Sequence, residues 1–283
     1  MLRIAIQAKG RLYEETMTLL AGAGIKLNKE KRTLLVSASG LPIEILFMRD
    51  DDIPAAVYDK VADAGIVGEN EYVEKGSEAL LVKRLGFSKC RLALAIPKED
   101  DYEGLQWFEA KVIATSYPAI LKNFLAKRGI KAQVHVIGGS VEIAPAIGIA
   151  QAIFDIVGSG DTLTSNNLKM VETVMHSEAV LIASHDLSPE KDDILNKLIF
   201  RIDAVVAAES KKYVLLNAPK AALENIIQLL PGMKSPTVTP LADNGWVSIQ
   251  SVIDEADFWE RIGKLKALGA EGILVIPIEK MIL

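Results

Sequence analysis

The chain has 283 residues, of which 50% are hydrophobic and 24% are charged. This length is typical of two or three globular domains, and the composition is typical of a chain that buries an ample core. The net charge of −5 at pH 7 argues against a protein that binds nucleic acid mainly through a basic face.

The N-terminus and the cysteine count indicate where the protein works. Residues 1–6 lack the apolar core of a signal peptide, and no stretch reaches the ~18 apolar residues that span a membrane. Cys90 is the only cysteine, so the chain cannot form an internal disulfide, as is usual in a reducing compartment. We therefore expect a cytoplasmic protein that binds neither a membrane nor nucleic acid.

The first ninety residues predict strands that end in cations. Residues 2–6 are expected to form a buried strand followed by Lys9 and Arg11, and residues 43–48 a strand followed by Arg49. Ligands of open α/β sheets bind at the carboxyl ends of parallel strands, and a guanidinium group can bind phosphate bidentately. These cations suit a polyanion site, although Lys9 and Arg11 alone are equally compatible with solvated surface charge.

Two acidic features accompany these strands. The run at residues 50–52 is interpreted as the start of a helix in preference to a metal site, because acids favour the first helical turn. Asp63 begins a further predicted strand at residues 63–68.

The middle of the chain predicts a second set of strands, at residues 90–96, 111–115 and 133–137. Ser116 and Tyr117 lie on the turn after the second of them, where a hydroxyl and a ring could contact a nucleoside. Helix capping is the simpler interpretation of this turn. Glu142 follows a pair of glycines near another helix start, and we expect it close to the cleft.

Residues 154–164 carry the strongest local signal. An apolar run ends at Val157, and Gly158, Ser159, Gly160, Asp161, Thr162 and Leu163 follow it. Glycines permit a tight turn, and the N–H groups that open a following helix attract phosphate. Asp155 is placed to accept hydrogen bonds from sugar hydroxyls, so the stretch favours a ribose 5-phosphate site. A plain strand-to-helix turn remains the alternative, and no lysine follows as in nucleotide-binding P-loops.

The last third predicts a different domain. Residues 171–176 and 179–183 are expected to be paired strands, with the second crossing back to the first lobe, and residues 194–208 a connecting helix. From residue 213 the order is β-α-β-β-α-β, which is typical of ferredoxin-like domains. We therefore predict an α/β protein with a two-lobed, periplasmic-binding-protein-like clamp. Its first lobe comprises residues 1–90 and 179–208, its second residues 91–178, and the ferredoxin-like domain residues 209–283.

Several stretches together resemble the long form of ATP phosphoribosyltransferase, the first enzyme of histidine biosynthesis, over the full chain. They are Lys9–Leu12, Arg49–Pro54, Gly65–Asn70, Ala114–Pro118, Gly139–Pro145, the stretch after Phe154, Leu229–Gly232, Phe258–Glu260 and Ile276–Met281. The resemblance implies transfer of phosphoribosyl from phosphoribosyl pyrophosphate to N1 of ATP, with Mg²⁺ as cofactor and no assigned protein ligands for it.

The resemblance also implies roles for individual residues. Arg49, Lys9 and Arg11 are the candidate catalytic cations; Asp155, Gly158, Ser159, Gly160, Asp161, Thr162 and Leu163 would bind phosphoribosyl pyrophosphate; Asp63, Ser116, Tyr117 and Glu142 would bind ATP; and Asn217, Met233 and Thr237 would bind histidine as allosteric inhibitor. Asp161 departs from many relatives, which carry a neutral or basic residue there. The family interconverts between dimers and hexamers, so we expect a homo-oligomer.

Two other classes share parts of this pattern. A non-catalytic two-lobed binding protein would carry a signal peptide and would have little use for a phosphate loop. A regulatory subunit or transcription factor should carry a helix-turn-helix, and the sequence shows no basic recognition helix.

Overall fold

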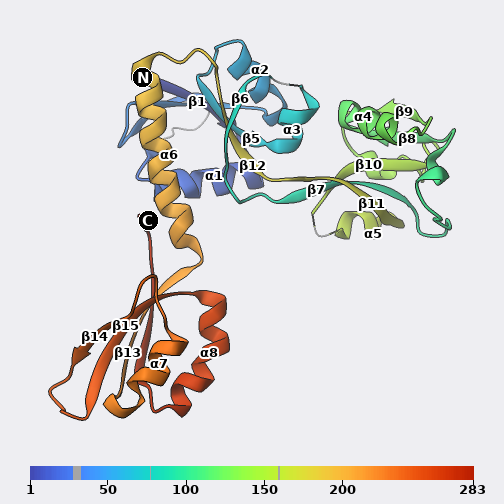
Figure 1. Ribbon diagram of the computed structural model, residues 1–283. Coiled ribbons are helices and arrows are strands. Elements are labelled where there is room, and N and C mark those ends of the chain that lie inside the picture. The colour runs from blue at the N-terminus through green and yellow to red at the C-terminus, as the bar shows by residue number, and fades with distance from the viewer. Residues whose placement is uncertain (28–32, 77, 159) are drawn as a thin grey trace. The chain divides into compact units, whose positions relative to one another are not determined.

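The computed structural model describes residues 1–27, 33–76, 78–158 and 160–283. Within this part the chain forms two compact units, residues 1–18 with 25–195, and residues 19–24 with 196–283. The first unit contains a seven-stranded and a five-stranded sheet, and the second contains a four-stranded sheet. The predicted α/β class, with two lobes and a ferredoxin-like domain, is confirmed (Figure 1).

The seven-stranded sheet forms lobe I. Its strand order is β2-β3-β4-β1-β5-β12-β6, and β1, β4 and β5 run parallel. The bounds are β1 Leu2–Gln7, β2 Lys26–Leu27, β3 Leu35–Ser39, β4 Ile43–Met48, β5 Ala64–Gly68, β6 Leu80–Arg84 and β12 Ala179–Ala183, with helices α1 Arg11–Gly22, α2 Ile53–Tyr58 and α3 Glu69–Glu74. Close packing against α2 explains the glycine at position 65, because a Cβ there would lie 2.6 Å from Ile53 Cγ2.

The five-stranded sheet forms lobe II, in the order β11-β7-β10-β8-β9. The bounds are β7 Cys90–Pro97, β8 Val112–Thr115, β9 Gln133–Val136, β10 Ala152–Val157 and β11 Leu168–Ser177, with helices α4 Pro118–Arg128 and α5 Asp161–Ser165 and 3₁₀ turns η2 Leu105–Phe108 and η3 Val141–Ile143. Strands β8, β9 and β10 are parallel. Phe108, Leu121 and Phe154 are fully buried in its core.

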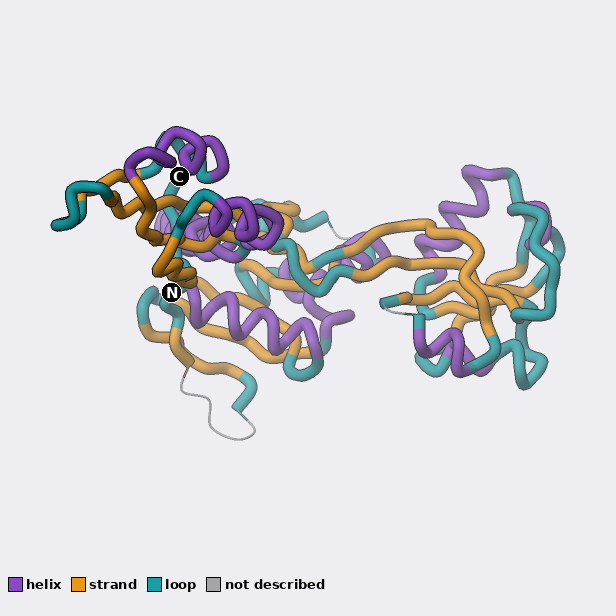
Figure 2. Tube along the Cα trace, turned by 90° about the horizontal axis from the view of Figure 1, so that it is seen from below, coloured by secondary structure: helices purple, strands orange, loops and turns teal. Residues whose placement is uncertain are grey.

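The lobes are joined where β11 of lobe II continues into β12 of lobe I, and this junction is called the crossover. The prediction that residues 171–176 and 179–183 pair with each other is wrong, because β11 pairs with β7 whereas β12 pairs with β5 and β6. Only Glu178 separates β11 from β12, which is too short for a hairpin turn, so the chain continues in one direction. The prediction that the second strand crosses back to lobe I is confirmed (Figures 1 and 2).

This crossover brings the carboxyl ends of both sheets to one place. Gly68, the last residue of β5, pairs with Ala179 at the start of β12. Val157, the last residue of β10, pairs with Arg91 at the start of β7, beside the pair of Cys90 with Ser177. The carboxyl ends of β5 and β10 therefore lie next to the same junction, where ligand sites of parallel α/β sheets form.

The second unit contains the predicted β-α-β-β-α-β order. Its bounds are β13 Lys211–Pro219, η4 Lys220–Ala222, α7 Leu223–Leu229, β14 Thr237–Pro240, β15 Trp246–Asp254, α8 Glu255–Ala267 and β16 Glu271–Pro277. The sheet order is β14-β15-β13-β16, antiparallel throughout. The boundary between the two units falls within helix α6, Pro189–Glu209, after Leu195, whereas the sequence places a domain boundary at residue 208. Among the described residues no helix is long and apolar enough to span a membrane.

Candidate functional site

Three cations lie at the carboxyl edge of lobe I. Lys9 and Arg11 follow β1, and Arg49 follows the neighbouring strand β4. All three side chains are exposed to solvent, and Arg49 is 79% exposed. Arg49 Nε lies 3.0 Å from Asp51 Oδ1, and this hydrogen bond holds the pKa of Arg49 above its ordinary value. The guanidinium is therefore charged and accessible to an anion.

The acidic run beside Arg49 forms a 3₁₀ turn, η1 Asp50–Asp52, just before α2. The predicted helix start is confirmed. The expected capping by an acid is not observed, because Asp52 at the N-cap makes no side-chain cap bond within the described residues. Asp51 pairs with Arg49 instead.

The predicted phosphate loop, residues 158–163, follows β10 at the carboxyl edge of lobe II. Gly158 is exposed, and Gly160 has φ +94°, a conformation that glycine adopts without strain. A Cβ at either glycine would meet no atom of the described residues within 4 Å. Leu163 is buried in the core beside Val157 and holds α5 against the sheet. Ser159 lies outside the described residues.

Asp161 and Thr162 are exposed in the first turn of α5. The first N–H groups of a helix have no partner within it, so they remain available to an anion. The negative charge of Asp161 at this end also interacts favourably with the helix dipole.

Asp155 and Glu142 lie near each other in lobe II. Asp155 lies on β10, and Glu142 lies on η3. Burial raises the pKa of Asp155 to about 6, and the nearby charge of Glu142 contributes to the rise. The N–H of Ile156 donates to Asp155 Oδ1 at 2.8 Å and opposes that shift. Asp155 therefore changes charge near neutral pH.

The turn after β8 is organised differently from the sequence expectation. The N–H of Tyr117 donates to Thr115 Oγ1 at 2.8 Å, and Ser116 is half-buried. Tyr117 is only 7% exposed, and its hydroxyl donates to Glu71 Oε1 at 2.8 Å. Both its ring and its hydroxyl are thus engaged by protein, which leaves Ser116 as the more accessible residue of this turn.

Asp63 lies at the amino-terminal edge of lobe I, away from the other predicted residues. It accepts the N–H of Arg3 at 2.8 Å and pairs with Lys191 Nζ at 2.7 Å. Because β5 runs parallel to β1, its first residues lie at the edge opposite Lys9. The structure does not bring Asp63 together with Ser116, Tyr117 and Glu142.

In the second unit, Asn217 and Thr237 share the face of the sheet that the helices leave open. On β13 the alternate residues Val214, Leu216 and Ala218 are buried, so Asn217 faces the other side. Thr237 pairs with Gln250, which lies between the buried Ile249 and Ser251 and so also faces that side. Met233 is 57% exposed and lies in the loop before β14.

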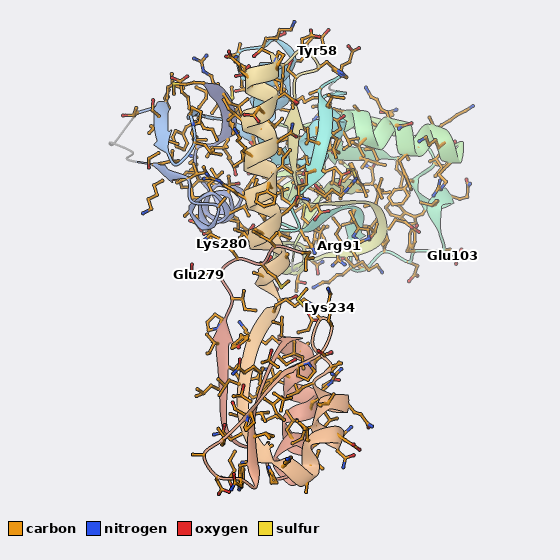
Figure 3. All side chains as sticks on the ribbon, turned by 60° about the vertical axis from the view of Figure 1, so that its left-hand side comes forward. Tyr58, Arg91, Glu103, Lys234, Glu279 and Lys280 are labelled. Atoms are coloured by element: carbon orange, nitrogen blue, oxygen red, sulfur yellow. The ribbon has the colours of Figure 1, made fainter. Side chains whose placement is uncertain are left out.

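The sequence interpretation missed two features of the first unit. Asn70, Glu71 and Ser177 form a buried polar group with Tyr117. Arg91, which is labelled in Figure 3, pairs with Val157 in the β7–β10 ladder. Its Nε is buried without a hydrogen-bond partner in the described part of the chain. An arginine inside an otherwise apolar strand was the available signal for Arg91. Nothing in the local pattern around Glu71 indicated its burial.

The described residues contain no group of three or more His, Cys, Asp or Glu side chains that could hold a metal ion. His135, His176 and His185 likewise form no such group in this part.

Comparison with known proteins decides the family. A family model described as HisG, ATP phosphoribosyltransferase, matches residues 49–204, and one described as HisG, C-terminal domain, matches residues 208–280. An ATP phosphoribosyltransferase from Parabacteroides distasonis is 69% identical over 282 residues and covers 100% of both chains. The chain belongs to the ATP phosphoribosyltransferase family. A relative of the same description from Bacteroides fragilis is 66% identical over 283 residues, again with 100% of both chains covered.

A solved structure supports the same family assignment. The ATP phosphoribosyl transferase (HisG:HisZ) complex from Thermotoga maritima matches with a TM-score of 0.61 and 28% identity, over 71% of this chain and 98% of that chain. The present chain belongs to the long form of the family, because the C-terminal family model matches its βαββαβ domain. It is a pentosyltransferase enzyme of histidine biosynthesis, so the two non-enzymatic alternatives are set aside.

The position of Asp63 gives a prediction. Replacing Asp63 with Ala should lower the free energy of unfolding by about 1–3 kcal/mol, because the Arg3 N–H loses its acceptor. The KM for ATP should stay within about twofold of the wild type, since a residue distant from the substrate does not change its binding. Thermal unfolding and steady-state kinetics measure both quantities. A large rise in the KM for ATP in a well-folded variant would contradict this prediction and would indicate that Asp63 contributes to ATP binding.

Proposed function

We propose that this chain transfers the 5-phosphoribosyl group of phosphoribosyl pyrophosphate to N1 of ATP and releases pyrophosphate. The observation that carries the proposal is the position of two exposed features at strand ends. A glycine loop follows β10, cations follow β1 and β4, and one crossover joins the carboxyl edges of the two sheets. A substrate with a phosphate at one end and pyrophosphate at the other suits such an arrangement.

The loop at residues 158–163 seats the 5-phosphate. Backbone N–H groups at the start of α5 and the hydroxyl of Thr162 donate to its oxygens, and the missing Cβ atoms of Gly158 and Gly160 leave room for them. The Asp155 carboxylate accepts hydrogen bonds from the ribose hydroxyls. Asp161 is exposed at the start of α5. Ser159 is expected to add a hydroxyl donor, but it lies outside the described residues.

The chemical step exchanges one bond for another at C1 of the ribose. The lone pair of adenine N1 forms the new bond to C1, and the bond from C1 to the pyrophosphate oxygen breaks, with its electron pair leaving on pyrophosphate. Negative charge therefore grows on the leaving group. Arg49, Lys9 and Arg11 stabilise that charge because they are already in place before it develops. Arg49 exchanges its partner Asp51 for the phosphate oxygens, with which its planar fork can make two hydrogen bonds.

Mg²⁺ is the proposed cofactor, and it binds together with the polyphosphates of the substrates. Such a Mg²⁺ ion keeps several waters and takes one or two carboxylates at most. This mode fits a described part of the chain without a group of three metal-binding side chains. When bound, the ion neutralises phosphate charge, and the protein side chains named above bind and orient the substrates.

On the nucleoside side, Ser116 and Glu142 are the proposed contacts. Ser116 is half-buried at the end of β8, and Glu142 is half-buried close to Asp155. Tyr117 supports this side from within, because its hydroxyl is used by Glu71. Asp63 is not part of this proposal for ATP, since both of its oxygens are engaged at the other edge of the sheet.

Histidine is the proposed allosteric inhibitor, bound at Asn217, Met233 and Thr237. The open sheet face that carries Asn217 and Thr237 also exposes Leu274 and Ile276, which are 54% and 44% exposed. A face of this kind favours contact with a second copy of the chain. We therefore propose a cytoplasmic homo-oligomer, with dimers and hexamers, in which histidine binds between neighbouring sheets.

Replacing Arg49 with Ala should reduce kcat by about 100-fold or more, because a preorganised charge on the leaving group is lost. Its side chain is exposed, so the unfolding midpoint should hardly change. Arg128→Ala is the matched control, since Arg128 is an exposed arginine at the far end of α4. Pyrophosphate release measures the rates, and an Arg49→Ala enzyme with wild-type turnover would remove Arg49 from the chemistry.

The raised pKa of Asp155 predicts a pH profile. Below about pH 6 the free enzyme carries Asp155 protonated, so kcat/KM for phosphoribosyl pyrophosphate should fall about tenfold per pH unit. The folded state keeps this proton between the ordinary pKa of 3.8 and about 6 while the unfolded chain releases it, so stability falls as pH rises through that window. Asp155→Asn should lose both dependences; an acid limb that survives in this variant belongs to another group.

Histidine at millimolar concentration should inhibit the wild-type enzyme, and Asn217→Ala and Thr237→Ala should raise the inhibitory concentration about tenfold or more by removing polar contacts. Lys264→Ala is the control, because Lys264 is exposed on α8, on the helical side of the sheet. Initial rates against histidine concentration test this. A wild-type enzyme that histidine does not inhibit would exclude histidine as the inhibitor. A similar loss of inhibition in Lys264→Ala would contradict the proposed site.

A further inference from the structure

Helix α4 of lobe II begins without a cap of its own. Its N-cap residue, Tyr117, makes no side-chain cap hydrogen bond, and Pro118 at the first position has no N–H. The N–H groups of Ala119 and Ile120 donate instead to Glu74, at 2.8 Å to Oε1 and 2.9 Å to Oε2. Glu74 is the last residue of α3 in lobe I. The other lobe therefore supplies the cap, together with a negative charge that favours the N-terminus of the helix.

A second contact lies beside the first and is buried. Tyr117 Oη donates to Glu71 Oε1 at 2.8 Å, and Asn70 Nδ2 donates to Tyr117 Oη at 3.2 Å. Asn70 in turn accepts a bond from Ser177 Oγ at 2.8 Å, and Ser177 Oγ accepts the Asn70 N–H at 3.0 Å. All four side chains are at most 8% exposed. Buried polar groups are costly unless they are paired, so this arrangement is specific to one placement of the two lobes.

We call these contacts the α3–α4 brace: Asn70, Glu71 and Glu74 of lobe I, Tyr117 and the first turn of α4 in lobe II, and Ser177 of the crossover. Its contacts involve two lobes and one crossover strand. Rotation of either lobe about the crossover would move α4 away from Glu74 and leave two N–H groups without a partner. The brace therefore holds the lobes at one separation in the absence of substrate.

We propose that Glu71 and Glu74 are positioning residues that keep the carboxyl edges of the two lobes at the distance the transfer reaction needs. The inference rests on the proposed function, because a substrate that contacts both edges binds only when both are in place. Asp155, whose charge is felt at Tyr117, and the cations of lobe I are then arranged before substrate arrives. If the arranged state were populated to a fraction f, the apparent dissociation constant would rise by 1/f.

The test uses Glu74→Ala in the full-length enzyme, with Glu109→Ala as the matched control. Glu109 Oε2 also accepts a backbone N–H, that of Lys131, at 2.9 Å, but both residues belong to lobe II. Native-state hydrogen exchange reports the cap directly. In Glu74→Ala the amides of Ala119 and Ile120 should exchange about fivefold faster or more, as for loss of a helix cap. In Glu109→Ala they should exchange at the wild-type rate.

Kinetics then separates positioning from simple structural support. Glu74→Ala should raise the KM of both substrates by a similar factor of about fivefold, with kcat changed less than about twofold, because bound substrates restore the separation. Glu74→Gln, which keeps one carbonyl acceptor, should recover part of the loss. Glu109→Ala should leave both constants unchanged.

Each contrary result has a distinct meaning. Wild-type exchange at Ala119 and Ile120 in Glu74→Ala would show that the brace does not exist in solution, whatever the activity. Faster exchange with unchanged KM values, or with a loss of kcat alone, would overturn the positioning role. A wild-type enzyme that releases no pyrophosphate would refute the proposed function and leave the exchange result standing.

Tyr117→Phe gives a second variant with the ring retained. It removes the hydroxyl that bonds to Glu71 and Asn70, so KM should rise as in Glu74→Ala. Combined with Glu71→Ala, the two changes should be non-additive, because they remove one shared interaction. Strict additivity of their effects on KM would contradict the contact.

Discussion

The arrangement of the first unit depends on one constraint, the single residue between β11 and β12. With only Glu178 available the chain cannot reverse, so a strand that ends in one sheet continues directly into the other. The same junction contains the start of β7, which pairs with the ends of β10 and β11. Because parallel strands all end at one edge of a sheet, the junction also determines where both ligand-binding edges lie. Every proposed substrate contact follows from that placement.

Charge is distributed unequally over the two edges. Lobe I contributes exposed cations on flexible side chains, with Arg49 paired to Asp51 and Arg11 to Glu15. Lobe II contributes backbone amides and the partly buried carboxylates Asp155 and Glu142. The cations gain little from their exposed ion pairs, so exchanging them for phosphate oxygens is not costly. The acids cannot move in the same way, and they suit the neutral hydroxyls of a sugar better than its phosphates.

Sequence reasoning located the strand ends well, because each is a buried apolar run followed by glycine or a cation, as at Val157 and Met48. It therefore placed Arg49 and the glycine loop correctly at strand ends. It did not find the partners of Tyr117, because the carboxylate that accepts the hydrogen bond from its hydroxyl is 46 residues away in the sequence. It also associated Asp63 with ATP although the direction of β5 puts that residue at the other edge. Local patterns predict where a strand ends, whereas pairing between distant side chains requires the tertiary fold.

The discontinuity of lobe I has a consequence for biosynthesis. Among the described residues, strand β6 pairs with β12 alone, and β12 also pairs with β5. On the ribosome, β6 therefore emerges long before β12, and all of lobe II is translated in between. The amino-terminal lobe must wait as an incomplete sheet with an open edge at β5, a state that invites wrong pairing with other chains. A nascent polypeptide of this enzyme is thus most exposed to aggregation or chaperone capture while its second lobe is being synthesised.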